Sequence, residues 1–173
     1  MASVWSRLRD RIGVGPLLIG GIIVAALAFI AVSVVHDLRT STVDIAAGSR
    51  FPCTVVSVYD GDGPINCAEV DAEGKQVRVR VKGIEARDSD NTCRLADRCP
   101  SASGAEAKAA LTRLAVGRIE CVSHGPSYNR VDAFCVNAQG QDVSCEMLRT
   151  GTAVRWAEYD PEGRLANCTP SRR

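Results

Sequence analysis

The stretch Gln76-Val77-Arg78-Val79-Arg80-Val81-Lys82 decides how this chain folds. Its three valines alternate strictly with basic residues, which is the period-two pattern of a strand with one buried and one exposed face. The valines are therefore expected in a core and the two arginines on the outer face. Taken alone, the basic row predicts no more than an ordinary solvated strand face.

The segment before this strand carries the signals of a β-hairpin. Residues 54–59 and 65–67 are β-rich, and Asp60-Gly61-Asp62-Gly63-Pro64 between them is turn-forming. Cys53 and Cys67 lie seven residues either side of Asp60. A hairpin centred on Asp60 puts them opposite one another, where a cross-strand disulfide is geometrically reasonable.

The remaining elements complete a small α+β domain. Residues 102–116 have helical apolar spacing, with Ser103 as an N-cap and Gly117 as a stop, and residues 143–150 predict a second short helix. Residues 118–122 and 133–137 are again β-like. The order of three strands, helix, two strands and helix predicts a five-stranded Greek-key barrel of the OB type with two or three short helices.

The N-terminal part predicts a membrane helix. Residues 14–35 contain no charge, and 22 residues span roughly 33 Å as a helix, enough to cross the hydrocarbon core. A cleaved signal peptide is the alternative, since Ala31 and Ser33 suit a small-residue cleavage site. Three arginines precede the helix, so residues 1–13 are expected in the cytoplasm and the bulk of the chain outside, in the periplasm or at the cell exterior. Residues 36–50 then form a tether.

All eight cysteines follow this helix. An even number confined to the exported side predicts disulfides formed in an oxidising compartment. Zinc is disfavoured, because the sequence has no C-x-x-C pair and its only histidines are His36 and His124. We expect a sequential ladder in which the first and third bonds rest on strand pairing, the second on a short polar loop and the fourth on elimination. The pairs are Cys53 with Cys67, Cys93 with Cys99, Cys121 with Cys135, and Cys145 with Cys168.

Charge limits the mode of any nucleic-acid binding. Of the 21 basic and 20 acidic residues, three basic and one acidic residue precede position 37, which leaves 18 against 19 beyond it. An exported part with a net charge of about −1 has no bulk basic field to attract polyanions. A local arginine cluster is needed instead.

Three short motifs supply such a cluster together with acids. They are Asp60-Gly61-Asp62, Gly83-Ile84-Glu85-Ala86-Arg87-Asp88 and Tyr128-Asn129-Arg130. Carboxylates hold hard cations such as Ca²⁺, and guanidinium groups grip phosphate through paired hydrogen bonds. Singly, the first motif predicts a plain turn and the others surface loops. Together they predict a phosphodiester site.

These motifs resemble the thermonuclease family, the staphylococcal-nuclease-like domain, in an exported, disulfide-bearing and membrane-anchored form. The resemblance covers residues 51–159 and includes Val58 to Gly63, Arg80 to Asp88, and Tyr128-Asn129-Arg130. Gly104-Ala105-Glu106-Ala107 and Thr150-Gly151-Thr152-Ala153 also fit the family pattern. It implies an OB-type barrel over 51–159, followed by a C-terminal tail, 160–173, that carries Cys168.

The resemblance also implies roles for individual residues. Asp62 and Glu85 would bind Ca²⁺, and Asp88 would activate or position the attacking water. Arg80 and Arg130 would bind the scissile phosphate and neutralise its developing charge. Tyr128 is the candidate substrate-binding residue.

The chain departs from the family pattern at four positions. Asp88 is one methylene shorter than the family's glutamate, and Glu85 is one longer than its aspartate. Arg87 replaces a proline and introduces a cation within reach of either carboxylate, and Gly63 replaces a hydroxyl residue.

Two hypotheses follow. The first is a membrane-anchored, Ca²⁺-dependent nuclease that hydrolyses phosphodiester bonds in DNA or RNA. The second is a catalytically weak barrel that acts as an extracytoplasmic binding module. Neither implies a protein partner.

Overall fold

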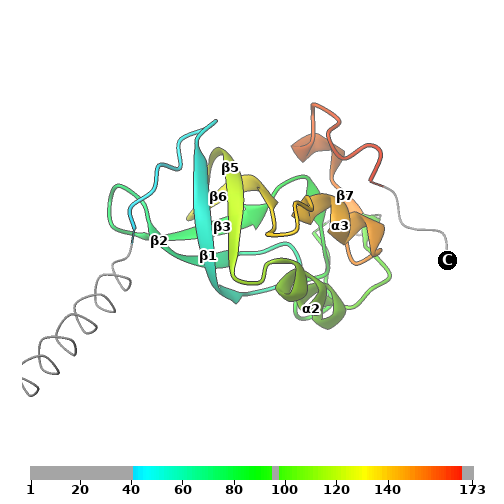
Figure 1. Cartoon of the computed structure of the whole chain (residues 1–173). Coiled ribbons are helices and arrows are strands. Elements are labelled where there is room, and N and C mark those ends of the chain that lie inside the picture. The colour runs from blue at the N-terminus through cyan, green and yellow to red at the C-terminus, as the bar shows by residue number, and fades with distance from the viewer. Residues whose placement is uncertain (1–40, 95–97, 169–173) are drawn as a thin grey trace, which may run out of the picture. The chain divides into compact units, whose positions relative to one another are not determined.

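Five strands close into a barrel in the order β1-β2-β3-β6-β5, with β5 returning to β1 (Figure 1). They are β1 (Arg50–Val58), β2 (Ile65–Val70), β3 (Gln76–Val81), β5 (Arg118–Ser127) and β6 (Arg130–Val136). β3 and β6 pair in parallel and the other neighbours are antiparallel. This computed structural model describes residues 41–94 and 98–168. A closed mixed barrel with two helices is consistent with the OB-type barrel predicted from the sequence.

The alternation in β3 produces the predicted inside and outside. Val77, Val79 and Val81 are 2%, 0% and 0% exposed, and the intervening arginines are only partly buried. The valines meet apolar side chains of the other strands in one core that includes Phe51, Ile65, Ile119 and Val131. Burial of these side chains is the main favourable contribution to folding.

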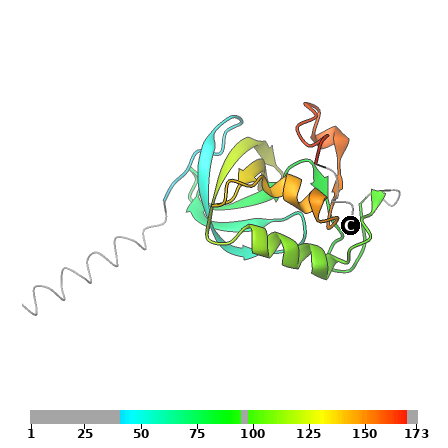
Figure 2. The same cartoon turned by 45° about the vertical axis from the view of Figure 1, so that its right-hand side comes forward.

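Two helices lie beside one another on one side of the barrel (Figures 1 and 2). α2 (Gly104–Leu114) begins at the predicted N-cap, Ser103, whose side chain forms a capping box with Glu106. α3 (Val143–Arg149) is capped by Asp142. Both helices begin within two residues of the predicted positions.

The β1–β2 hairpin differs in register from the prediction. Val58 pairs with Ile65 and Val55 with Cys67, so the turn is centred after Asp60 and Cys53 is not directly opposite Cys67. Cys53 lies two residues along the strand on the same face as Val55, which makes the cysteines diagonal neighbours. Their Cα atoms are 5.0 Å apart and the disulfide forms.

All four predicted disulfides are confirmed. Cys121 and Cys135 are direct cross-strand partners, as expected. The Cys145–Cys168 bond joins α3 to the C-terminal segment. Among the described residues no cysteine is left free.

The folded unit extends beyond residues 51–159 at both ends. Within the tether expected over 36–50, Thr42 bridges to Val70, and Ser49 and Gly48 exchange backbone hydrogen bonds with Ser123. Beyond Tyr159, Asp160 and Leu165 are 2% and 1% exposed. The described parts of these segments, 41–50 and 160–168, therefore belong to the packed structure.

A second, two-stranded sheet was not predicted. β4 (Ile84–Glu85) pairs with β7 (Val154–Arg155), and a 3₁₀ turn, η2 (Ala157–Tyr159), follows. The Trp156 N–H donates to the carbonyl of Gly83 at 2.9 Å. We call residues 154–168 the C-terminal strap, because they run from this pairing to the Cys145–Cys168 bond.

In the described ranges, no helix is long and apolar enough to cross a bilayer. The membrane helix expected over residues 14–35 lies outside those ranges, as does the predicted cytoplasmic segment 1–13.

Replacement of Gly61 tests how the turn between β1 and β2 packs against the rest of the domain. A Cβ atom there would lie 2.4 Å from the Ala107 Cβ and 2.7 Å from the Ala86 Cβ. We expect Gly61→Ala to lower the free energy of unfolding by about 1 to 3 kcal/mol through overpacking, measured by urea denaturation. In Gly61→Ala/Ala107→Gly the combined loss should be smaller than the sum of the single losses. Simple additivity would contradict the close packing described here.

Candidate functional site

The turn after β1 is folded inward and not exposed to solvent. Asp60 and Asp62 are only 7% and 8% exposed, and the carbonyl of Asp62 accepts a hydrogen bond from the Val81 N–H at 2.9 Å. Gly61 allows this because it fits against Ala86 and against Ala107 of α2. Two carboxylates thereby lie at one end of the barrel, beside β3. The motif is thus the turn of the β1–β2 hairpin, as its residue types predict, and both of its acids are buried.

Arg80 joins this turn to β4. Its Nη2 atom lies 2.8 Å from Asp62 Oδ2 and 3.3 Å from Glu85 Oε2. The other Glu85 oxygen accepts the backbone N–H of Arg94 at 3.0 Å, so the Cys93–Cys99 loop also holds this side chain. The side chains of Arg80, Asp62 and Glu85 are 11%, 11% and 6% exposed. Three of the predicted site residues therefore form one buried cluster.

Asp60 links this cluster to two more predicted residues. The negative charges of Asp60 and Asp62 repel each other across the turn. The negative charge of Asp88 and the positive charge of Arg130 also act on Asp60. Asp60 Oδ1 is buried without a hydrogen-bond partner, and so is Arg130 Nε. The Asp60-Gly61-Asp62 motif predicts Asp60 only as a turn residue, so its central position was missed, although this motif was the available signal.

Burial changes the protonation of these acids. Desolvation raises the pKa of Asp62 to about 8, although the Arg80 guanidinium opposes the shift. Desolvation also raises the pKa of Asp60. With Glu85, three buried carboxyl groups face one buried guanidinium, so full ionisation would leave an uncompensated negative charge. A divalent cation would balance this charge, and carboxylate oxygen is the ligand that Ca²⁺ prefers.

Two aromatic rings of the C-terminal strap cover Arg80. Its guanidinium carbon lies 5.4 Å from the centre of the Trp156 ring and 6.0 Å from that of Tyr159. The rings meet edge to face at 4.6 Å. Cation–π contacts of this kind hold a guanidinium in place without using its hydrogen-bond donors. Because the β4–β7 pairing connects distant segments, no local sequence pattern indicates these two residues.

Arg87 does not pair with either carboxylate. Its Nε donates to the Pro100 carbonyl at 2.9 Å and its Nη1 to the Asn91 carbonyl at 2.7 Å. The Arg87 guanidinium therefore binds two backbone carbonyls and no acid. Asp88 is exposed beside this loop, where Gly104 of α2 packs tightly on its carbonyl.

Tyr128 lies apart from the acidic cluster. It is 93% exposed on the β5–β6 turn, at a φ of 58°, and lines a groove together with Arg130. Arg130 is thus the predicted residue that connects the cluster with this groove.

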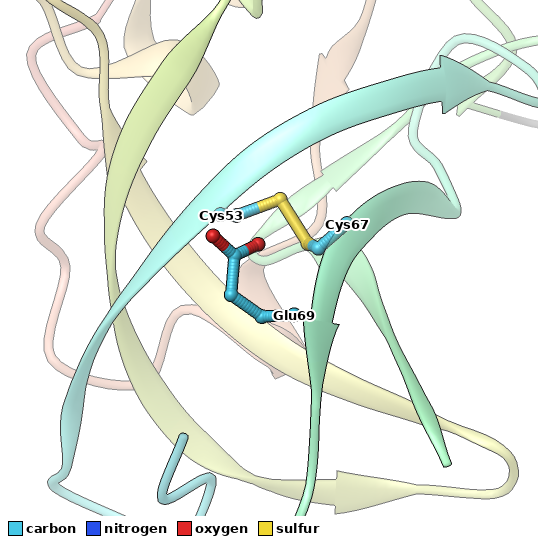
Figure 3. Close-up of side chains that lie close together, drawn as sticks. All are labelled: Cys53, Cys67 and Glu69. Atoms are coloured by element: carbon cyan, nitrogen blue, oxygen red, sulfur yellow. A yellow bond between two sulfur atoms is a disulfide. The ribbon is translucent and has the colours of Figure 1, made fainter. Parts of the chain in front are cut away.

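One other group of potential metal ligands, two cysteines and a glutamate, does not form a metal site. Cys53, Cys67 and Glu69 are the only three metal-ligand side chains in the described ranges whose ligand atoms all lie within 4.8 Å of one another (Figure 3). The two sulfurs form a disulfide, and Glu69 accepts hydrogen bonds from Thr54. Asp60, Asp62 and Glu85 do not close to that distance, so binding a cation among them requires their oxygens to move together.

Comparison with known proteins adds no assignment, since neither protein-family models nor curated proteins match this chain.

The raised pKa of Asp62 predicts a pH-dependent stability. Between its ordinary value near 3.8 and about 8, the native state keeps a proton on Asp62 that the unfolded state releases. The free energy of unfolding should therefore fall as the pH rises through this window. We expect the melting temperature of Asp62→Asn to fall less between pH 5 and pH 8 than that of the parent, measured by thermal denaturation.

Asp90→Asn is the matched control. The Thr92 hydroxyl bond lowers the pKa of exposed Asp90, so this residue titrates below the window and its variant should follow the parent. Parallel curves for parent and Asp62→Asn would contradict the buried, protonated state.

Proposed function

We propose that this chain is a thermonuclease-like enzyme that hydrolyses phosphodiester bonds in DNA or RNA with the help of Ca²⁺. The observation that carries the proposal is the meeting of Asp62, Arg80 and Glu85 in one buried cluster. Strands and turns separate these residues in the sequence, yet a single guanidinium nitrogen contacts both acids. Asp88 and Arg130 act on the same cluster through Asp60.

The residues divide into two chemical groups. Asp62 and Glu85 would hold Ca²⁺, with Asp60 adding negative charge behind them; the ion would supply positive charge next to the reacting phosphate. Arg80 and Arg130 would bind the phosphate oxygens. Among the described residues, Arg80 uses only Nη2 in hydrogen bonds, so its Nε and Nη1 remain for a substrate.

Asp88 is the candidate general base. It is exposed, and its side chain makes no hydrogen bond within the described part of the chain, so solvent water reaches it. In the proposed reaction Asp88 takes a proton from the water that attacks phosphorus, the P–O ester bond breaks, and the leaving oxygen takes a proton from solvent. Arg80 and Arg130 stabilise the charge on the phosphoryl oxygens. Tyr128, at the rim beyond Arg130, binds the substrate strand.

The proposal includes a location outside the cytoplasm, with residues 14–35 as the membrane anchor. Four disulfides in the described domain support an oxidising compartment, since such bonds are rare in the cytosol.

One observation favours the second candidate, a binding module with little catalysis. Arg80 is bound to both proposed cation ligands and covered by Trp156 and Tyr159. A guanidinium held in this way reaches a phosphate only if the phosphate enters beside the two rings. Binding of nucleic acid without release of nucleotides would support this candidate.

Release of acid-soluble nucleotides from DNA and RNA tests the enzyme proposal. We expect full-length protein to release nucleotides with Ca²⁺ and not with chelator. The rate of nucleotide release should be at least about a hundredfold lower in Arg80→Ala/Arg130→Ala, because both phosphate-binding cations are gone. Arg113→Ala/Arg118→Ala, which removes two exposed arginines elsewhere, should keep the parent's rate. Equal release by the parent and the Arg80/Arg130 variant would refute the proposed site.

A further inference from the structure

A groove lies next to the acidic cluster, between the start of β3 and the β5–β6 turn. Its volume is about 480 Å³, and its lining includes Lys75, Arg78, Tyr128, Asn129 and Arg130. Arg130 lines the groove, and its charge acts on Asp60 beside the cluster. A ligand bound at the cluster can therefore continue into the groove.

Strand pairing puts two arginines side by side in this groove. Val79 of β3 pairs in parallel with Val131 of β6, and both valines are buried. One residue earlier on each strand, Arg78 and Arg130 consequently share the outer face. Neither guanidinium has an ion pair or hydrogen bond within the described part of the chain, and Arg130 Nε is buried without a partner. Like charges on neighbouring strands repel, so an anion between them would relieve the repulsion.

The acids of the groove do not neutralise these arginines. Asp71 accepts the backbone N–H groups of Glu73 and Lys75 within the β2–β3 turn. Glu73 is exposed, and no described ion pair involves it. The end of the groove formed by Arg78 and Arg130 remains positively charged.

We propose that Arg78 binds the phosphate adjacent to the scissile one in a single nucleic-acid strand. This inference rests on the proposed function. Arg78 and Arg80 are two residues apart on the same face of β3, about 6.6 Å along the strand, so each can contact one of two successive phosphates. An unpaired base of the same strand stacks on exposed Tyr128, which is the combination of cationic groove and aromatic platform that single strands favour.

Binding of a fluorescein-labelled, single-stranded oligothymidylate with hydrolysis-resistant phosphorothioate linkages tests this site. Fluorescence anisotropy would be measured on full-length protein with Ca²⁺ over a range of salt concentrations. Arg78→Ala should bind roughly tenfold more weakly, because one charge-assisted hydrogen-bond donor is lost. Its plot of log affinity against log salt should be shallower by about 0.7, the value for one phosphate contact on a single strand. Arg113→Ala, an exposed arginine elsewhere, should match the parent in both readouts.

A chemical change in the ligand tests the same contact without a change in folding. Replacing the phosphate next to the scissile one by a neutral methylphosphonate should weaken binding to the parent and leave binding to Arg78→Ala almost unchanged. Unchanged affinity and salt slope in Arg78→Ala, with cleavage by the parent intact, would overturn this inference alone. A parent that neither binds nor cleaves the strand would overturn the proposed function as well.

Discussion

The structure of the site depends on one buried guanidinium. Arg80 comes from the regular strand β3, and a single nitrogen of its side chain contacts Asp62 from the β1–β2 turn and Glu85 from β4. Without it, the buried side chains of Asp62 and Glu85 would have no ion-pair partner among the described residues, a situation that proteins rarely tolerate. Full ionisation of these acids would leave a surplus of negative charge, which makes the cluster suitable for a divalent cation. One electrostatic arrangement thus explains both the fold of the turn and the proposed chemistry.

The rest of the domain holds Arg80 and Glu85 in place. The barrel fixes the position of β3, and α2 presents Ala107 to Gly61 so that the acidic turn lies inward. The C-terminal strap pairs with β4 and lays Trp156 on the Arg80 guanidinium. Leu165 of the same strap packs on Gly83, in the turn between Arg80 and Glu85. The Cys145–Cys168 bond closes this strap onto α3. These contacts therefore hold the side chains of Arg80 and Glu85 in position.

The sequence predicted the elements whose signals are local. Alternation placed the β3 valines in the core, and Ser103 marked the start of α2. Strand pairing, a short polar loop and elimination predicted the disulfides. The missed features depend on long-range packing. Burial of Asp60 requires Ala86 and Ala107 to meet Gly61. Arg87 binds the Pro100 carbonyl because the folded chain brings the two residues together. Trp156 is near Arg80 only because two very short strands pair, which no local pattern indicates.

Terbium luminescence tests the central claim most directly, because Tb³⁺ takes oxygen ligands as Ca²⁺ does. Trp156 contacts Arg80, which binds both proposed ligands, so this tryptophan lies beside the site and can excite a bound ion. An ion bound by Asp62 and Glu85 should emit when tryptophan is excited. The emission should disappear in Asp62→Asn/Glu85→Gln and in Trp156→Phe, and Ca²⁺ should displace it. Undiminished emission in Asp62→Asn/Glu85→Gln, or none from the parent, would contradict a cation site in this cluster.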